Sequence, residues 1–174
     1  MVTTLVALSI ISIQIAMVVF LIIWIRKPEL LSKIYEHSRI ILLLIFIPSV
    51  LGSLIYEYRF GYEPCLLCWY QRIAIFSVAI LSLTGDIRTN KLLQKQVIIF
   101  SLLGLLVAIV HNYIDIVPTG IDICGAGPSC LKRYIYEFGY VTIPMMSLTV
   151  LLAGFLLALF TKKYKSQAPF SALK

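Results

Sequence analysis

Five long apolar runs constrain this chain more than any other feature. They lie near residues 3–25, 40–57, 66–84, 96–114 and 141–161. Each is long enough, or nearly so, to cross the roughly 30 Å hydrocarbon core of a membrane. Of the 174 residues, 60% are hydrophobic and only 13% are charged, and a soluble domain of this size could not bury so much apolar surface. The sequence therefore predicts an integral membrane protein with five spans.

The first run, residues 1–25, contains no charged residue. A secretory signal peptide is the alternative to a membrane span. The run has no basic segment at its start and no small-residue cleavage site before Arg26, and its apolar stretch is too long for a signal peptide. We therefore expect a span that is retained.

The distribution of lysine and arginine predicts the orientation of the spans. Four of these residues lie in 26–39, three in 85–95 and four in the tail 162–174, whereas only three lie in the loops 58–65 and 115–140. Basic residues favour the cytoplasmic side, so the C-terminus is expected there and the N-terminus outside. The net charge of +7 then reflects attraction to anionic inner-leaflet lipid, and no nucleic-acid partner is expected.

All four cysteines fall in or beside the two loops that this orientation places outside. They form two pairs, Cys65 with Cys68 and Cys124 with Cys130. The outer compartment is the one in which disulfides persist. The loop 115–140 is also rich in glycine and proline, which indicates turns and an adaptable backbone. Together these features point to thiol–disulfide chemistry at the membrane surface.

The first pair forms a CxxC motif at a predicted helix start. Pro64 suits the beginning of a helix, so Cys65 and Cys68 lie in or just before the first turn. Free backbone N–H groups and the helix dipole lower a thiol pKa there. Arg72 shares a helix face with Cys68, and a guanidinium below the membrane surface needs a partner or a function. A Cys68 thiolate or the carbonyl oxygen of an electron acceptor would serve; the alternative is a snorkelling arginine beside an ordinary disulfide.

The second pair, Cys124 and Cys130, encloses five residues, two of them glycine. Such a segment can close a small disulfide ring and can also open it to a partner; the alternative is a static loop staple. A zinc site built from both pairs is a weaker alternative in an oxidising loop, so no metal is expected. Trp69 follows the CxxC motif where a c-type haem would require histidine. His111, near the outer end of the fourth span, is either functional or merely solvated.

Several of these motifs resemble one family. The run Pro64-Cys-Leu-Leu-Cys-Trp-Tyr-Gln-Arg72 resembles the CxxC signature of the bacterial DsbB-type disulfide-bond formation proteins. The Val-His-Asn-Tyr run at 110–113, the short cysteine loop and Ile143-Pro144 are similar to the smaller BdbC-type members. The resemblance covers roughly 40–161. It implies an all-α, four-helix transmembrane bundle in the bacterial cytoplasmic membrane, to which the span 1–25 is an additional helix.

The resemblance also implies an activity. Members of the family reoxidise an extracytoplasmic, DsbA-like thiol oxidase of the thioredoxin fold and pass the electrons to a membrane quinone, ubiquinone or menaquinone. This activity supports disulfide formation in exported proteins. Carried over by position, Cys124 would be attacked by the partner's thiolate, and Cys130 would exchange with Cys65. Cys68 would react with the quinone.

Two further residues acquire roles from the resemblance, and two features depart from it. Arg72 would hold a quinone oxygen and His111 would lie near the quinone ring. The span 1–25 has no counterpart in the family's bundle, and the Cys124–Cys130 spacing is shorter than in its best-known members. The alternative function is a non-enzymatic membrane subunit or assembly factor with two structural disulfides. An exporter of reducing power is disfavoured, because no cysteine is predicted in the cytoplasm or in mid-membrane.

Overall fold

The computed structural model describes the chain apart from residues 1, 118–123, 125–127 and 168–174. Residues 168–174 of the expected tail 162–174 lie outside this part, as do 118–123 and 125–127 of the expected outer loop 115–140. The five predicted spans are confirmed as long apolar helices. They are α1 (Val2–Arg26), α3 (Ser38–Tyr58), α4 (Leu66–Thr84), α5 (Lys91–Ile116) and α6 (Ile143–Gln167).

Three boundaries differ clearly from those predicted. Helix α6 continues to Gln167, past the expected end of its span near 161 and into the expected tail. Helix α5 begins at Lys91 rather than near 96, because the Asn90 side chain accepts hydrogen bonds from the N–H groups of Leu92 and Leu93 and caps the helix. The segment 26–39, expected as a loop, contains a 3-10 helix, η1 (Pro28–Leu31), and a short helix, α2 (Ser32–Glu36). Leu31 is buried there, which anchors this connection to the protein.

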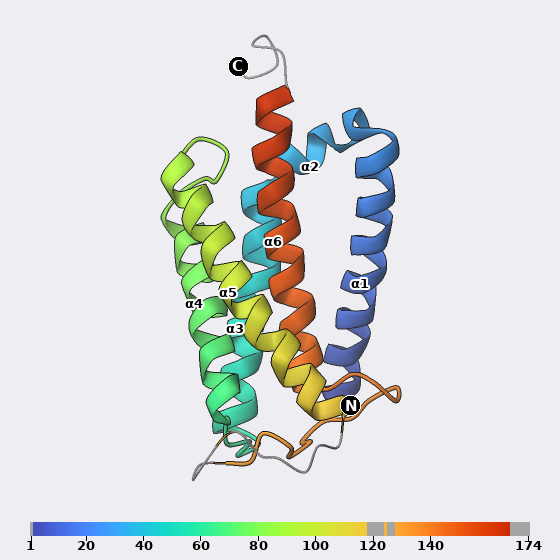
Figure 1. Cartoon of the computed structure of the whole chain (residues 1–174), viewed down its shortest axis with the longest axis vertical. Coiled ribbons are helices and arrows are strands. Elements are labelled where there is room, and N and C mark those ends of the chain that lie inside the picture. The colour runs from blue at the N-terminus through green and yellow to red at the C-terminus, as the bar shows by residue number, and fades with distance from the viewer. Residues whose placement is uncertain (1, 118–123, 125–127, 168–174) are drawn as a thin grey trace.

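Helices α3 to α6 form the predicted four-helix bundle (Figure 1). Helix α4 packs against α3 and α5, and α6 packs against α5 and α3. Two glycines permit close approach inside the bundle. A Cβ at Gly104 would lie 2.5 Å from the Cβ of Ala74, and one at Gly154 would lie 2.5 Å from the ring of Phe46. The start of α1 and the segment 128–142 lie at one end of the bundle, and the end of α6 lies at the other (Figure 1).

Helix α1 packs against α6, outside the bundle. The rings of Phe20 and Trp24 each meet Phe160 edge-on, with centroids 5.3 and 5.6 Å away. Nearer the cysteine end, Gln14 donates a hydrogen bond to the Thr149 hydroxyl at 2.9 Å and accepts one from Tyr140 at 2.7 Å. These contacts fasten α1 to α6 along much of its length.

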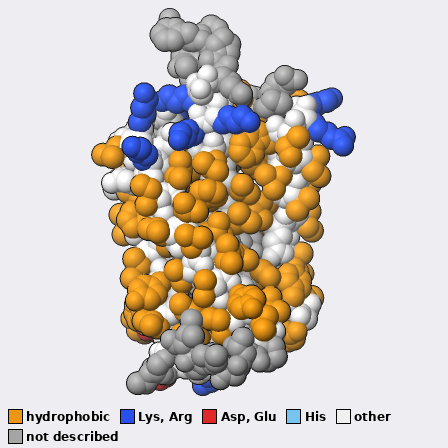
Figure 2. All heavy atoms as spheres, in the orientation of Figure 1, with side chains coloured by type: hydrophobic (Ala, Val, Ile, Leu, Met, Phe, Trp, Pro, Cys, Tyr) orange, Lys and Arg blue, Asp and Glu red, His pale blue; other side chains and the backbone are white. Residues whose placement is uncertain are grey.

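The outer surface of the helices is apolar. Ile15, Leu44, Ile80 and Leu103, on α1, α3, α4 and α5, are each more than half exposed. Hydrophobic side chains cover the middle of the molecule, and lysine and arginine gather around the end where the C-terminus lies (Figure 2). A surface of this kind suits lipid. The fold is that of a multi-pass membrane protein.

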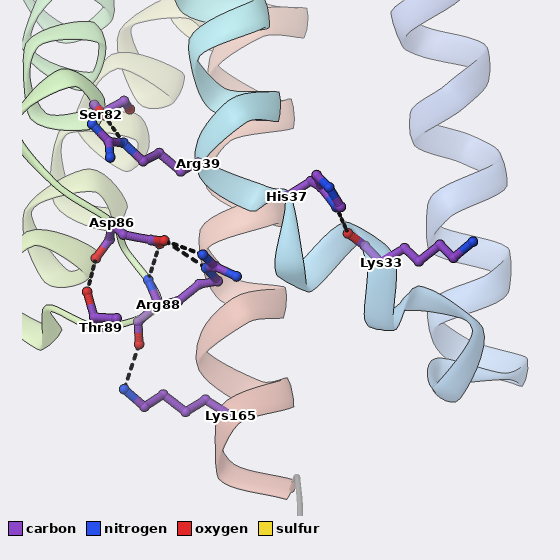
Figure 3. A network of polar contacts seen from close by, with 8 residues as sticks. All are labelled: Lys33, His37, Arg39, Ser82, Asp86, Arg88, Thr89 and Lys165. Carbon is purple, nitrogen blue, oxygen red and sulfur yellow. Dashed lines mark hydrogen bonds and ion pairs between the residues drawn. The ribbon is translucent and has the colours of Figure 1, made fainter. Parts of the chain in front are cut away.

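Charged side chains join the helices at this basic end (Figure 3). Arg39 on α3 donates hydrogen bonds to the carbonyl groups of Ser82 and Leu83, at the end of α4. Lys165 on α6 donates to the carbonyl group of Arg88, between α4 and α5. Burial raises the pKa of Asp86, but hydrogen bonds from Arg88 outweigh it and hold that pKa below its usual value. The hydrogen bonds from Arg39 satisfy carbonyl groups at the end of α4 that the helix itself leaves free.

Gly104→Ala tests the close approach of the helices. The new methyl group would lie 2.5 Å from Ala74 and 2.9 Å from Leu151. Overpacking of this kind costs about 1–3 kcal/mol, more than the roughly 1 kcal/mol that alanine gains over glycine in a helix. We expect a lower midpoint of thermal unfolding in detergent, followed by circular dichroism. Gly52→Ala is the matched control, because its Cβ would meet nothing within 4 Å. Equal midpoints for the two variants would contradict the packing described.

Candidate active site

The CxxC motif lies at the start of α4, as its sequence predicts. Cys65 is the N-cap residue, with an extended backbone, and its sulfur accepts a hydrogen bond from the N–H of Cys68 at 3.3 Å. Cys68 is therefore in the first turn. Pro64 directly precedes the cap and keeps the chain out of the helix before that point.

The two sulfur atoms of this motif lie close together. The Sγ atoms of Cys65 and Cys68 are 2.7 Å apart, and both residues are free cysteines. The hydrogen bond with Cys68 lowers the pKa of the Cys65 thiol far below its ordinary value; burial opposes this effect, and a hydrogen bond with His111 adds to it. A thiol of this kind is a thiolate at neutral pH, which is the reactive form in disulfide exchange.

The second cysteine pair lies against the first. Cys124 and Cys130 form a disulfide, with Cα atoms 5.8 Å apart. Both are buried, and they cluster with Cys65 and Cys68 at the end of the bundle. The structure therefore brings the two pairs, more than fifty residues apart in the chain, into one sulfur cluster.

His111, on α5, lies between the pairs and is 2% exposed. Its Nε2 atom is 3.9 Å from the sulfur of Cys65 and 3.3 Å from the carbonyl oxygen of Cys130. Gln71 meets the other ring nitrogen, with 3.0 Å between its Nε2 and the Nδ1 of His111. Because the amide of Gln71 donates to Nδ1, a neutral ring carries its hydrogen on Nε2, facing the sulfur and the carbonyl group.

The same group has the residue types of a metal site. Ligand atoms of Cys65, His111 and Cys130 lie within 4.8 Å of one another. A sulfur in a disulfide is not the thiolate that zinc requires, and Cys130 is bonded to Cys124. In the state described, the arrangement suits sulfur exchange better than metal binding.

Arg72 finds its partners on α3. Its guanidinium donates to the Ser53 hydroxyl at 2.5 Å and to the Ser53 carbonyl oxygen at 2.7 Å. It also pairs with Glu57 at 2.5 Å, and its side chain is only 10% exposed. The ring of Trp69 lies 5.3 Å from the guanidinium carbon. Glu57 neutralises much of the buried charge, which lowers the cost of placing arginine in a membrane span.

A cavity of about 430 Å³ begins at this site. Cys65, Cys68, Arg72 and His111 all line it at the cysteine end. It continues between α1, α3 and α6, where its walls are mainly apolar. Its volume falls in the range of about 300–1,000 Å³ usual for small-molecule sites, and mostly apolar walls with a few polar groups are typical of them.

Aromatic and charged contacts hold the connecting segments over the sulfur cluster. The rings of Tyr62, before α4, and Tyr134, before α6, stack with centroids 4.7 Å apart. Arg133 pairs with Asp115 at the end of α5, with 2.6 Å between nitrogen and oxygen. The segment that follows Cys130 is thus tied to both neighbouring parts of the bundle.

Sequence reasoning missed three residues of this site: Gln71, Ser53 and Glu57. Glu57 and Gln71 lie at or inside long apolar spans, and a polar side chain at such a place usually has a partner or a function. That signal was available for both. Nothing in the sequence singles out Ser53, because serine is common in membrane helices and its hydroxyl often bonds to its own helix.

Known proteins match most of the chain. Residues 35–162 match the family model described as "Disulfide bond formation protein DsbB". The chain is 33% identical over 132 residues to the "Probable disulfide formation protein C" of Halalkalibacterium halodurans, which covers 74% of this chain and 96% of that protein. It is 30% identical over 121 residues to the "Disulfide bond formation protein C" of Bacillus subtilis (strain 168), covering 68% and 88%.

A third relative, the "Probable disulfide formation protein" of Chlamydia pneumoniae, is 35% identical over 118 residues, which cover 67% of this chain and 85% of that protein. No solved structure matches the chain. The matched residues include α3, α4, α5, most of α6 and all four cysteines, whereas α1 lies before them. On this evidence, the chain belongs to the DsbB family of disulfide bond formation proteins.

Proposed function

We propose that the protein is a thiol:quinone oxidoreductase that reoxidises an extracytoplasmic, thioredoxin-like thiol oxidase. One observation carries the proposal: the sulfur atoms of Cys65 and Cys130 and a ring nitrogen of His111 lie within 4.8 Å of one another. Exchange between disulfides needs direct contact of sulfur atoms, because it proceeds through a mixed disulfide. The two cysteine pairs are near enough for such a contact.

The first transfer takes place on the loop pair. A thiolate of the reduced partner attacks Cys124, forms a mixed disulfide with it and releases Cys130 as a thiolate. The second partner thiol then closes the partner's own disulfide and releases Cys124. The partner loses two electrons and two protons, and the pair Cys124 and Cys130 becomes a dithiol.

The second transfer takes place between the pairs. The Cys130 thiolate attacks Cys65 of a Cys65–Cys68 disulfide and releases Cys68. Cys124 then attacks Cys130, restores the loop disulfide and releases Cys65. The low pKa of Cys65 makes it a good leaving group in this step. The N–H of His111, 3.9 Å from the same sulfur, can stabilise the negative charge that develops there.

The residues around the cavity fit a quinone. Arg72 provides N–H donors for a carbonyl oxygen, Cys68 provides the reacting sulfur, and the remaining walls suit an apolar ring and tail. When bound, a quinone supplies a two-electron, two-proton acceptor. The side chains of Cys68 and Cys65 deliver these electrons and become a disulfide again, and the N–H groups of Arg72 would donate hydrogen bonds to an oxygen that gains negative charge.

The charge pattern supports one orientation of the protein in the membrane. Lysine and arginine gather at the end opposite the cysteine cluster (Figure 2). Basic residues favour the cytoplasmic face, so we place the cysteine end outside, in a compartment that contains thiol oxidases of exported proteins. The protein would then be a bacterial cytoplasmic-membrane protein whose C-terminus is in the cytoplasm.

Cys68→Ser and Cys124→Ser should each abolish electron transfer. Each substitution breaks one pair, so that no disulfide can form there. Absorbance of a soluble quinone, followed with a reduced thioredoxin-like dithiol and purified protein in detergent, measures the activity. Wild-type protein should reduce the quinone. Full turnover by Cys68→Ser would refute the electron path. An inactive wild type with intact disulfides, tested with ubiquinone and menaquinone analogues, would favour two structural disulfides.

Cys130→Ser and Cys124→Ser form a matched pair that tests which loop sulfur meets the partner. Cys130→Ser leaves Cys124 free, and we expect it to accumulate a mixed disulfide with the oxidised partner. Cys124→Ser should accumulate much less, because Cys130 lies inward near Cys65 and His111. Non-reducing electrophoresis detects the linked species. Stronger trapping by Cys124→Ser would reverse the two roles.

Arg72→Ala should raise the KM for quinone about tenfold or more, since a hydrogen bond from a charged group contributes about 1.5–3 kcal/mol. The variant also leaves Glu57 unpaired, so its unfolding midpoint should fall. The double variant Arg72→Gln with Glu57→Gln removes both charges and should recover the midpoint but not the KM. Recovery of both would mean that Arg72 acts only by joining α3 to α4.

A further inference from the structure

Helix α1 lies outside the residues that match the family, yet one of its faces lines the cavity at the active site. We propose that α1 is the outer wall of the quinone site and that its residues Val6, Ile10 and Ile13 hold the apolar tail of the quinone. This inference rests on the proposed function, which places the quinone head beside Cys68 and Arg72. It extends the site to a helix for which the matched family region gives no role.

The spacing of the lining residues on α1 is regular. Val6, Ile10 and Ile13 follow one another by four and three residues, so they lie on one face of the helix. Ile15 lies on another face, where it is 61% exposed. Only one stripe of α1 therefore faces the cavity, although the helix is apolar all round.

The space between α1 and α3 is kept open by the way in which α1 is attached. Within residues 2–117, which the structure describes without a gap, no Cα atom of α1 comes within 8 Å of one of α3. Phe20, Trp24 and Gln14 all bind α6 instead. The facing wall on α3 includes Pro48 and Gly52, and a Cβ at Gly52 would meet nothing within 4 Å.

A second observation points to a ligand in this cavity. Tyr56, on α3, lines the cavity and is 8% exposed. Among the described residues, its buried hydroxyl has no hydrogen-bond partner. A buried hydroxyl without a partner is costly, and a carbonyl oxygen of a bound molecule would accept its hydrogen bond.

The polar end of the cavity favours a neutral head over an anionic one. Glu57 pairs with Arg72 and Asp115 pairs with Arg133. The remaining charges on the lining, Lys132 and Glu63, have opposite signs, so a phosphate would gain little net attraction there. Arg72 and Tyr56 both carry donors, which suit the two carbonyl oxygens of a quinone ring. The apolar stretch beside α1 then suits an isoprenoid tail better than a phospholipid, whose charged headgroup would have to lie at this polar end.

Ile13→Phe tests whether α1 lines the quinone site, because the larger side chain fills part of the cavity beside this helix. The larger ring would occupy part of the space for the tail, and we expect about tenfold weaker binding of a long-tailed quinone, as overpacking predicts. Binding of a tail-less quinone with the same head should change less than about twofold. The matched control Ile15→Phe should leave both affinities unchanged. Quenching of tryptophan fluorescence in oxidised protein without dithiol measures binding in the absence of turnover.

Tyr56→Phe distinguishes contacts with the quinone ring from contacts with its tail. It removes a donor to the ring, so it should weaken the binding of both quinones. Unchanged affinity of the long-tailed quinone for Ile13→Phe would overturn the proposal. If Ile13→Phe instead lost co-purified phospholipid while its quinone affinity stayed unchanged, the occupant of the cavity would be a lipid chain, and the proposal would also be overturned. Reduction of the tail-less quinone by wild type tests the proposed function separately, so the two ideas fail by different results.

Discussion

The contacts of His111 join the two cysteine pairs to each other and to the helical bundle. His111 belongs to α5. Its imidazole contacts the sulfur of Cys65, at the start of α4, and the backbone of Cys130, in the connection between α5 and α6. Gln71 orients the ring from the opposite side. The contact of His111 with Cys130 joins the disulfide loop to the helical core beside the CxxC motif. The close packing of α4 on α5, permitted by Gly104, sets the distance between Gln71 and His111.

The buried charge of Arg72 depends on a different helix pair. Ser53 and Glu57 are one turn apart on α3, and both face the guanidinium on α4. The ion pair therefore joins two helices beside the cavity that Cys68 also lines. Because the pair of Arg72 and Glu57 has no net charge, Arg72 acts mainly as a hydrogen-bond donor. Such a donor suits a neutral carbonyl oxygen better than a charged phosphate.

Much of this fold follows from short-range features of the sequence. The lengths of the apolar runs predict the five helices, and Pro64 with the CxxC spacing predicts both thiols at a helix start. The partner of Arg72 could not be derived, because the pairing of α3 with α4 depends on their relative rotation and height. The packing partner of α1 could not be predicted either. The surface of this helix is apolar all round, so no apolar stripe indicates which helix it packs against. The start of α5 was missed because the cap at Asn90 was overlooked.

In the described part of the chain α1 packs against α6 and not against α3, which has a consequence for the routes by which substrates would reach the site. Under the proposed function, a soluble thiol partner would reach the sulfur cluster at the end of the bundle, from water. A long apolar molecule would reach the same cluster sideways, through the gap between α1 and α3, without leaving the bilayer. Its tail would exchange one apolar surrounding for another, so shape rather than water exclusion would select it. Two substrates with opposite solubility would then have separate entrances, and neither would block the other.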